Sequence, residues 1–267
     1  MSFLKLVNLS KSFNTDKGIV QVIKNISIDI KKGEFVAIVG PSGCGKTTLL
    51  KIIAGLEKPD DGSVLLQGEE ANSNNIVLVF QNPLLFPWAT VQENVGFGLR
   101  LKGIPKIKIE KVVLDLLKKI GLNDFKSFYP HQLSGGMQQK VALARALAVD
   151  PVLLLMDEPF ASLDAIAREE LQEELINIWR MFEKTIVLVT HSLREALLLA
   201  DIVYVLTPRP TVIKSVHPIE IPRPRNAYLP ILSHLELKLK KELAESKKIG
   251  NLDNLTFSDS QLTSDKL

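Results

Sequence analysis

The sequence is poor in several features that would place it in a specialised class of protein. It has a single cysteine in 267 residues, which excludes an intrachain disulfide and favours a reducing compartment. Its longest apolar stretches, such as residues 196–206, are interrupted by Asp201. None therefore approaches the roughly 20 residues that span a bilayer. The first residues carry no basic segment followed by a long apolar stretch, so we expect no signal peptide.

The charge balance is weak, with a net charge of +3, and aromatic residues make up only 6% of the chain. No basic face with interleaved aromatic residues is evident, so the sequence does not predict binding to nucleic acid. The hydrophobic content of 46% is ample for a packed core. The length suits one large α/β domain, or a domain with a small insert, and there is no internal repeat or tandem second domain.

Apolar runs alternate with helical patterns along most of the chain. The opening, residues 4–30, alternates apolar and polar positions, which predicts antiparallel strands with one solvated face. Residues 91–149 have apolar positions at helical spacing and predict an inserted helical subdomain, about residues 85–150. Strands are predicted at residues 35–39, 76–80, 152–156, 185–190 and 202–206. We therefore expect an α/β fold with a mostly parallel sheet, an N-terminal antiparallel β subdomain and a helical insert.

A glycine-rich segment joins the first buried strand to a helix expected to begin near Thr47. Backbone N–H groups that converge at a helix N-terminus form an anion site, so the segment predicts a P-loop that binds nucleotide phosphates. Lys46 would bridge the β- and γ-phosphates, and the Thr47 hydroxyl would bind Mg²⁺. A purely structural glycine turn is the alternative. The residues of this site are Gly40, Pro41, Ser42, Gly43, Cys44, Gly45, Lys46, Thr47 and Thr48.

Cys44 lies inside this loop, beside the helix N-terminus. That setting lowers the pKa of a thiol, so we expect a reactive side chain. We interpret the residue itself as a small side chain that fills space and has no role of its own.

Two carboxylates, Asp157 and Glu158, follow the predicted strand at residues 152–156. Ligands of parallel sheets lie at the carboxyl ends of the strands. Asp157 would hold Mg²⁺ through water, and Glu158 would orient or deprotonate an attacking water molecule. A carboxylate pair that caps the following turn is the structural alternative.

A second phosphate site is predicted by the segment Leu133-Ser134-Gly135-Gly136-Met137-Gln138-Gln139, which enters a helix about two dozen residues before the carboxylates. One nucleotide hardly needs two such sites in one protomer. Two protomers arranged head to tail would use both.

These motifs, taken in order with Gln81 after its strand, Ser162-Leu163-Asp164 and His191, resemble those of the ATP-binding cassette (ABC) ATPases of membrane transporters. The resemblance covers about residues 2–225, and residues 226–267 would form a helical, partly disordered tail. It implies an ATPase that binds ATP and Mg²⁺ on a P-loop NTPase core.

The resemblance also implies roles for residues outside the phosphate loop. Phe13 would stack on adenine, at a position that is commonly Tyr in the family. Gln81 would sense the γ-phosphate and Mg²⁺ and begin the link to the membrane partner. Asp164 would touch the partner protomer near its phosphate loop, and His191 would contact the γ-phosphate and steady the water together with Glu158. As an isolated histidine at a strand end, His191 could instead be a packing residue.

The segment from Leu133 to Gln139 would act across the dimer. Ser134, Gly135 and Gly136, with Gln138 beside them, would contact the γ-phosphate bound by the opposite protomer. One departure from the family lies near His191, where Ser192 stands in place of the usual Asp. It would alter how the histidine loop is held without removing a residue that acts directly on ATP.

A narrower resemblance, to importers of nitrate, sulfonates and taurine, rests on Phe86-Pro87-Trp88, Glu195-Ala196 and Ile221-Pro222-Arg223-Pro224-Arg225. It implies a homodimer or heterodimer of cassettes on a separate permease at the cytoplasmic face of the cell membrane. An extracytoplasmic solute-binding protein would choose the small anionic solute. The alternatives are an importer of polyamines, phosphate or metal chelates, and an ABC ATPase that acts on nucleic acid or ribosomes, whose long insertions or tandem cassettes are absent.

Overall fold

The computed structural model describes residues 2–16, 18–71, 75–226 and 229–259. The chain forms two compact units. Unit one comprises residues 1–71 and 189–267, and unit two comprises residues 72–188. Within the described ranges, no helix is both long and apolar enough to cross a membrane.

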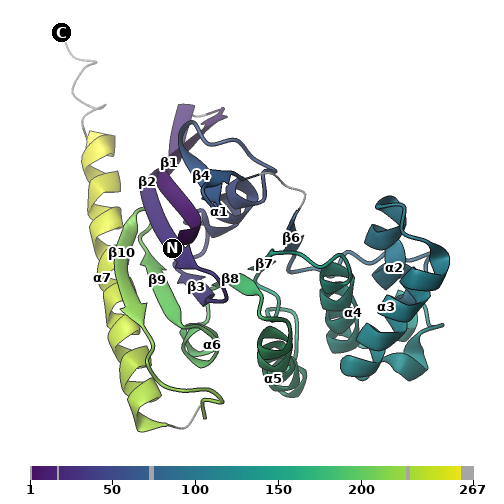
Figure 1. The fold of residues 1–267 in the computed structure, drawn as a ribbon. Helices are drawn as coiled ribbons and strands as arrows, with labels where there is room; N and C mark the ends of the chain where they lie inside the picture. The colour runs from purple at the N-terminus through teal and green to yellow at the C-terminus, as the bar shows by residue number, and fades with distance from the viewer. Residues whose placement is uncertain (1, 17, 72–74, 227–228, 260–267) are drawn as a thin grey trace. The chain divides into compact units, whose positions relative to one another are not determined.

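An antiparallel sheet opens unit one (Figure 1). Strands β1 (Ser2–Thr15) and β2 (Gly18–Lys31) form a hairpin, and β4 (Asp61–Leu66) and β5 (Glu69–Glu70) extend it in the order β2-β1-β4-β5. Buried and exposed positions alternate along much of β1 and β2, as expected for a sheet with one solvated face. The predicted antiparallel subdomain is therefore confirmed.

The other strands of unit one include the buried strand that leads into the phosphate loop. This strand, β3 (Phe35–Val39), is fully buried and pairs in parallel with β9 (Ile202–Leu206). Strand β10 (Ile213–Pro218) runs antiparallel to β9. It was not predicted, because its residues lie in a proline-rich stretch and are mostly half-buried. Helices α1 (Lys46–Ile53) and α6 (Leu193–Leu199) follow the phosphate loop and His191.

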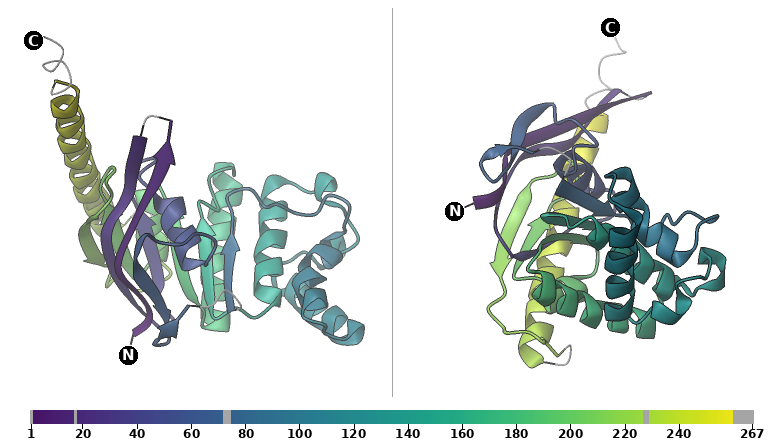
Figure 2. Two further views of the ribbon diagram at one scale, coloured as in Figure 1. Left: turned by 90° about the horizontal axis from the view of Figure 1, so that it is seen from above. Right: turned by 45° about the vertical axis from the view of Figure 1, so that its right-hand side comes forward.

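The last helix, α7 (Pro230–Asp259), runs along β10 and β9 (Figure 2). Glu242 of α7 accepts a hydrogen bond from the Ser215 hydroxyl of β10 at 2.7 Å. The expected loss of order from about Gly250 stays a prediction, since α7 continues to Asp259 and residues 260–267 lie outside the described part.

Unit two contains two parallel strands and the predicted helical insert (Figure 1). Strands β6 (Ile76–Val79) and β7 (Leu153–Asp157) pair in parallel, with Ile76 opposite Leu153. Two 3₁₀ turns, Asn123–Phe125 and Pro130–Gln132, precede the second predicted phosphate site at residues 133–139. Strand β8 (Thr185–Thr190) is buried throughout, and the boundary between the two units falls within it, between Leu188 and Val189. The helices are α2 (Val91–Leu101), α3 (Lys106–Lys119), α4 (Gly135–Ala148) and α5 (Ala165–Phe182).

Candidate nucleotide-binding and hydrolysis site

The phosphate loop depends on two glycines with left-handed backbone angles. Gly43 has φ of 74° and Gly45, the N-cap of α1, has φ of 115°. A Cβ atom on Gly45 would also lie 2.7 Å from Cγ1 of Val22. Both positions therefore need glycine for the tight turn and the close approach to β2.

Lys46 is buried, with 5% of its surface exposed. Its Nζ donates to the backbone oxygens of Gly40 and Pro41, each at 3.0 Å. The ammonium of this first residue of α1 is thus held against the loop. Thr47 is exposed and Thr48 half-buried in the first turn, which contains no acidic residue. A glycine N-cap, a helix N-terminus and a fixed cation together suit a polyphosphate anion.

Two residues from the connection between β9 and β10 donate hydrogen bonds to this loop. The buried Thr211 donates its hydroxyl to the backbone oxygen of Cys44, and Arg209 donates Nε to the backbone oxygen of Gly43. These bonds occupy two backbone carbonyls of the loop. No local pattern predicts either contact, because the partners are more than 160 residues apart.

The thiol of Cys44 does not behave as predicted. Cys44 is 1% exposed, and burial raises the pKa of its thiol despite the neighbouring Lys46 and Arg209. The predicted lowering of this pKa is therefore wrong. Desolvation of the thiolate outweighs the helix N-terminus and both cations.

Phe13 lies on β1 and keeps 36% of its surface exposed, so its ring remains accessible. It belongs to unit one together with the phosphate loop and His191.

The His191 loop follows β8 and is held by a buried hydrogen-bond network. The Thr190 hydroxyl donates to Oε2 of Glu195 at 2.5 Å and accepts from the backbone N–H of Ser192 at 3.0 Å. Ser192 in turn caps α6, its hydroxyl accepting from the backbone N–H of Glu195 at 3.3 Å. His191 itself is exposed. Ser192, at the place of the family's Asp, thus serves as a helix N-cap.

The carboxyl-terminal side of α6 is held by the Ile221–Arg225 segment. The Arg225 guanidinium donates to four backbone oxygens, and burial together with the nearby Arg223 lowers its pKa to about 10. Arg223 pairs with Asp201. This motif, used in the narrower family resemblance, therefore has a structural role at the C-terminal end of α6. The four acceptors are Leu197, Ala200, Ile219 and Ile221.

In unit two, Asp157 ends β7 and is 8% exposed. Glu158 follows with φ of 47°, a left-handed angle that is uncommon for a side-chain-bearing residue. Its backbone oxygen accepts from the N–H of Ala161 at 3.1 Å, which closes a turn after the strand. The strained turn sends the chain away from the strand direction immediately after Asp157.

Residues 133–139, the second predicted phosphate site, are called the signature segment and lead into α4. Ser134 is the N-cap, and its hydroxyl accepts from the Met137 N–H at 3.3 Å. Gly135 and Gly136 form the first turn, which contains no acidic residue. The side chain of Gln138 is held by the preceding turn, because its Nε2 donates to the backbone oxygens of Pro130 and Leu133 at 3.0 and 3.3 Å.

The same region brings Asp164 close to the signature turn. Asp164 is the N-cap of α5 and accepts from the N–H groups of Ile166 and Ala167, both at 3.0 Å. A Cβ on Gly136 would lie 3.2 Å from Cβ of Ala167, so only glycine fits comfortably there. The start of α4 and the start of α5 thus pack as one surface.

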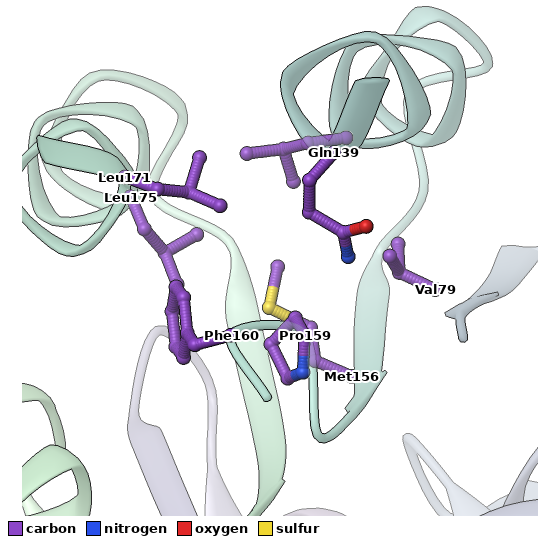
Figure 3. A pocket seen from close by; sticks show the side chains of 8 residues that line it. Val79, Gln139, Met156, Pro159, Phe160, Leu171 and Leu175 are labelled. Carbon is purple, nitrogen blue, oxygen red and sulfur yellow. The ribbon is translucent and has the colours of Figure 1, made fainter. Parts of the chain in front are cut away.

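Behind Glu158 lies a small apolar cavity between α4, α5, β6 and β7 (Figure 3). Gln139 of α4 enters it, and its Nε2 donates to the backbone oxygen of Phe80 at 3.4 Å, one residue before Gln81. Among the described residues, its buried Oε1 has no hydrogen-bond partner. The lining residues are Val79, Gln139, Leu143, Met156, Pro159, Phe160, Leu171 and Leu175.

The segment after the exposed Gln81 is clamped from two helices. Arg145 of α4 donates to the backbone oxygens of Pro83 and Leu84, both at 2.8 Å, and lies 5.6 Å from the Phe86 ring centroid. Asn94 of α2, fully buried, accepts from the Phe86 N–H at 2.8 Å and donates to three further backbone oxygens. Neither Arg145 nor Asn94 belongs to a sequence motif that predicts this role.

That clamped segment presents apolar side chains to solvent. Trp88 is 76% exposed and Leu84 is 59% exposed. Phe86 packs inward against Phe97, with ring centroids 4.5 Å apart. The segment is therefore a rigid loop that displays two large apolar residues.

Comparisons with known proteins agree with these motifs. A family described as ABC transporter matches residues 23–161. An uncharacterised ABC transporter ATP-binding protein of Methanocaldococcus jannaschii is 51% identical over 84% of each chain. The taurine import ATP-binding protein TauB of Pelagibacter ubique is 49% identical over 79% of this chain and 80% of its own. The aliphatic sulfonates import ATP-binding protein SsuB of Bacillus cereus is 43% identical over 82% and 86%.

Solved structures show the same fold. A dimeric ATP-binding cassette, solved in a post-hydrolysis state with ADP and Pi bound, superposes with a TM-score of 0.73 at 33% identity, covering 82% of this chain and 99% of that chain. The cbiO1 protein of Clostridium perfringens, part of the ABC transporter complex cbiONQ, gives 0.74 at 28% identity, with 95% and 99% covered. With the family match spanning just over half of its residues, the chain belongs to the ABC transporter family, as an ATP-binding subunit that hydrolyses ATP.

Proposed function

We propose that this chain powers the uptake of a small anion of the taurine, sulfonate or nitrate type, by closing as an ATP-bound dimer on a separate permease. Two relatives, 49% and 43% identical to this chain, are named as ATP-binding proteins for the import of taurine and of aliphatic sulfonates. The Phe86-Pro87-Trp88 loop and the Ile221–Arg225 segment support the same branch of importers.

The observation that carries the dimer mechanism is the presence of two helix starts suited to phosphate. Gly45 and Lys46 begin α1 in unit one, and Ser134 begins α4 in unit two. Neither first turn contains an acidic residue. Each protomer would hold the triphosphate of its own ATP on the Lys46 loop and offer Ser134, Gly135 and Gly136 to the ATP of its partner.

The remaining roles follow from the residues' chemistry. Phe13 offers a ring face for adenine. Glu158 orients and deprotonates the attacking water, and His191 holds the γ-phosphate and that water in line.

Mg²⁺ prefers oxygen ligands, and the Thr47 hydroxyl, the Asp157 carboxylate and the Gln81 amide oxygen fit it. The metal would neutralise the charge on the transferring phosphate.

ATP would shift the dimer towards closure, because the contacts to Lys46 and Ser134 are all made only when the two protomers close. The rigid loop at Leu84 and Trp88 would carry that movement to the permease, since Arg145 and Asn94 fix it to α4 and α2. Hydrolysis at Glu158 would then release the clamp. The permease places this chain at the cytoplasmic face of the cell membrane, while the permease and an extracytoplasmic solute-binding protein select the cargo.

Uptake of labelled taurine in cells of the source organism tests the whole proposal. Cells that carry Glu158→Gln as their only copy should lose taurine or sulfonate uptake while retaining uptake of polyamines and phosphate. Loss of polyamine, phosphate or metal-chelate uptake instead would assign the cargo to another importer class. Unchanged uptake of every solute would contradict a role in import.

A further inference from the structure

The ammonium group of Lys11 is fixed in one place on β1. Its Nζ lies 2.8 Å from Oε1 of Glu57 and 3.3 Å from Oδ1 of Asp60, and it donates to the backbone oxygen of Lys58 at 2.7 Å. The side chain is only 12% exposed. An ammonium has three hydrogens to donate, and the three acceptors use them all.

This fixed cation lies over the ring of Phe13, with Nζ 5.2 Å from the ring centroid. The two residues are two positions apart on one strand, so their side chains share a face. Asp60 also accepts from the backbone N–H of Ser12 at 2.6 Å, which secures the strand between them. Phe13 is therefore supported from one side while a third of its surface stays exposed.

We propose that Lys11 is a positioning residue for the nucleotide base: it holds the Phe13 ring from one face and polarises it, so that adenine stacks on the other face. This inference rests on the proposed stacking role of Phe13. A cation over an aromatic face draws on the ring's electron density, and an electron-poor ring is a better stacking partner for an electron-rich purine.

The charge of Lys11 does not make it a phosphate ligand. Glu57 and Asp60 carry one negative charge each beside it, so the cluster as a whole offers no excess positive charge to a polyphosphate, whereas the ammonium itself lies over the Phe13 ring. The effect of Lys11 should therefore be confined to the base. An effect on binding of the base without an effect on binding of the phosphates distinguishes a positioning role from a general stabilising one.

The test compares two ligands by calorimetry: ATP, and inorganic tripolyphosphate, which has no base. Lys11→Met keeps the aliphatic stem and removes the cation. We expect it to weaken ATP binding about three- to tenfold. Tripolyphosphate binding should stay the same, and so should kcat at saturating ATP. Lys11→Arg should restore ATP binding, and Lys5→Met, on the same strand, is the matched control.

A double-mutant cycle with Phe13→Leu assigns the effect to the ring. In the Phe13→Leu background, Lys11→Met should cause no further loss of ATP affinity. Equal weakening of ATP and tripolyphosphate by Lys11→Met would overturn the inference, as would an undiminished effect without the ring. If Phe13→Leu weakens ATP binding but Lys11→Met does not, only this inference fails. If Phe13→Leu has no effect, the stacking role in the proposed function is wrong and the inference falls with it.

Discussion

The Thr190 hydroxyl donates to the Glu195 carboxylate at 2.5 Å, in a buried network directly beside His191. The bond spans the turn between β8 and α6, so it fixes the direction in which His191 leaves the sheet. Because His191 would have to meet the γ-phosphate at hydrogen-bond distance, the network around it should affect catalysis although it touches no substrate.

We predict that Thr190→Val, which keeps the shape of the side chain, lowers kcat about tenfold with little change in KM. Thr190→Ser retains the hydroxyl and should keep most of the activity. Steady-state ATPase assays of the three proteins check this. A Val variant with normal kcat, or a Ser variant as slow as Val, would show that the network does not position His191.

The clamp between Arg145 and the loop after Gln81 gives a second prediction. Arg145→Met leaves the backbone oxygens of Pro83 and Leu84 without their donor, which should lower the free energy of unfolding by about 2 kcal/mol. Hydrogen exchange at residues 82–90 should rise with it. Lys111→Met, at an exposed lysine on α3, is the control and should change stability by less than about 0.5 kcal/mol. Unaltered exchange in the loop would contradict the clamp.

Burial of Cys44 predicts low thiol reactivity. Since burial raises the pKa of the thiol and hides the sulfur, maleimide labelling of the folded protein at neutral pH should be at least about tenfold slower than in denaturant. As pH rises above the ordinary thiol pKa, the unfolded chain ionises first, so stability should fall there. Rapid labelling of the folded protein, blocked by ATP, would mean that the thiol is exposed after all.

The hydrogen bonds of Arg225 lead to a prediction about the stability of the protein around α6. Arg225→Met removes the donor of four backbone oxygens and should cost about 2–4 kcal/mol in the free energy of unfolding. Arg225→Lys can keep part of this network and should show an intermediate loss, because an ammonium lacks the planar fork. Urea denaturation of the three proteins measures the difference. A Lys variant as stable as the parent would show that charge alone suffices.

Much of the fold follows from local pattern. Strands β3 and β8 are buried on both faces and appear as continuous apolar runs, so their positions were predicted within a residue or two. The starts of α1 and α4 were predicted from the glycine-rich loop and from the Ser134-Gly135-Gly136 turn. Strand β10 was missed because its pairing with β9 is a tertiary choice that its own residues do not encode.

The candidate site likewise combines features that local sequence predicts with features that depend on tertiary contacts. Its motifs are short and local, so the phosphate loop and the Asp157-Glu158 pair could be predicted from the residues themselves. Phe13, Gln81 and His191 were named only through the family resemblance. Thr211 and Arg145 act on backbone atoms of segments distant in sequence, and no local pattern marks them. The pKa of Cys44 was mispredicted for the same reason, since burial comes from packing and not from its position in the loop.

In the proposed mechanism, ATP closes two of these chains into a dimer through Lys46 of one and Ser134 of the other. The most direct measurement is the mass of purified Glu158→Gln protein by light scattering, with and without Mg²⁺ and ATP. We predict a monomer without nucleotide, a dimer with ATP, and a monomer again when Ser134→Arg is added. A Glu158→Gln protein that stays monomeric at saturating Mg²⁺ and ATP would contradict the account.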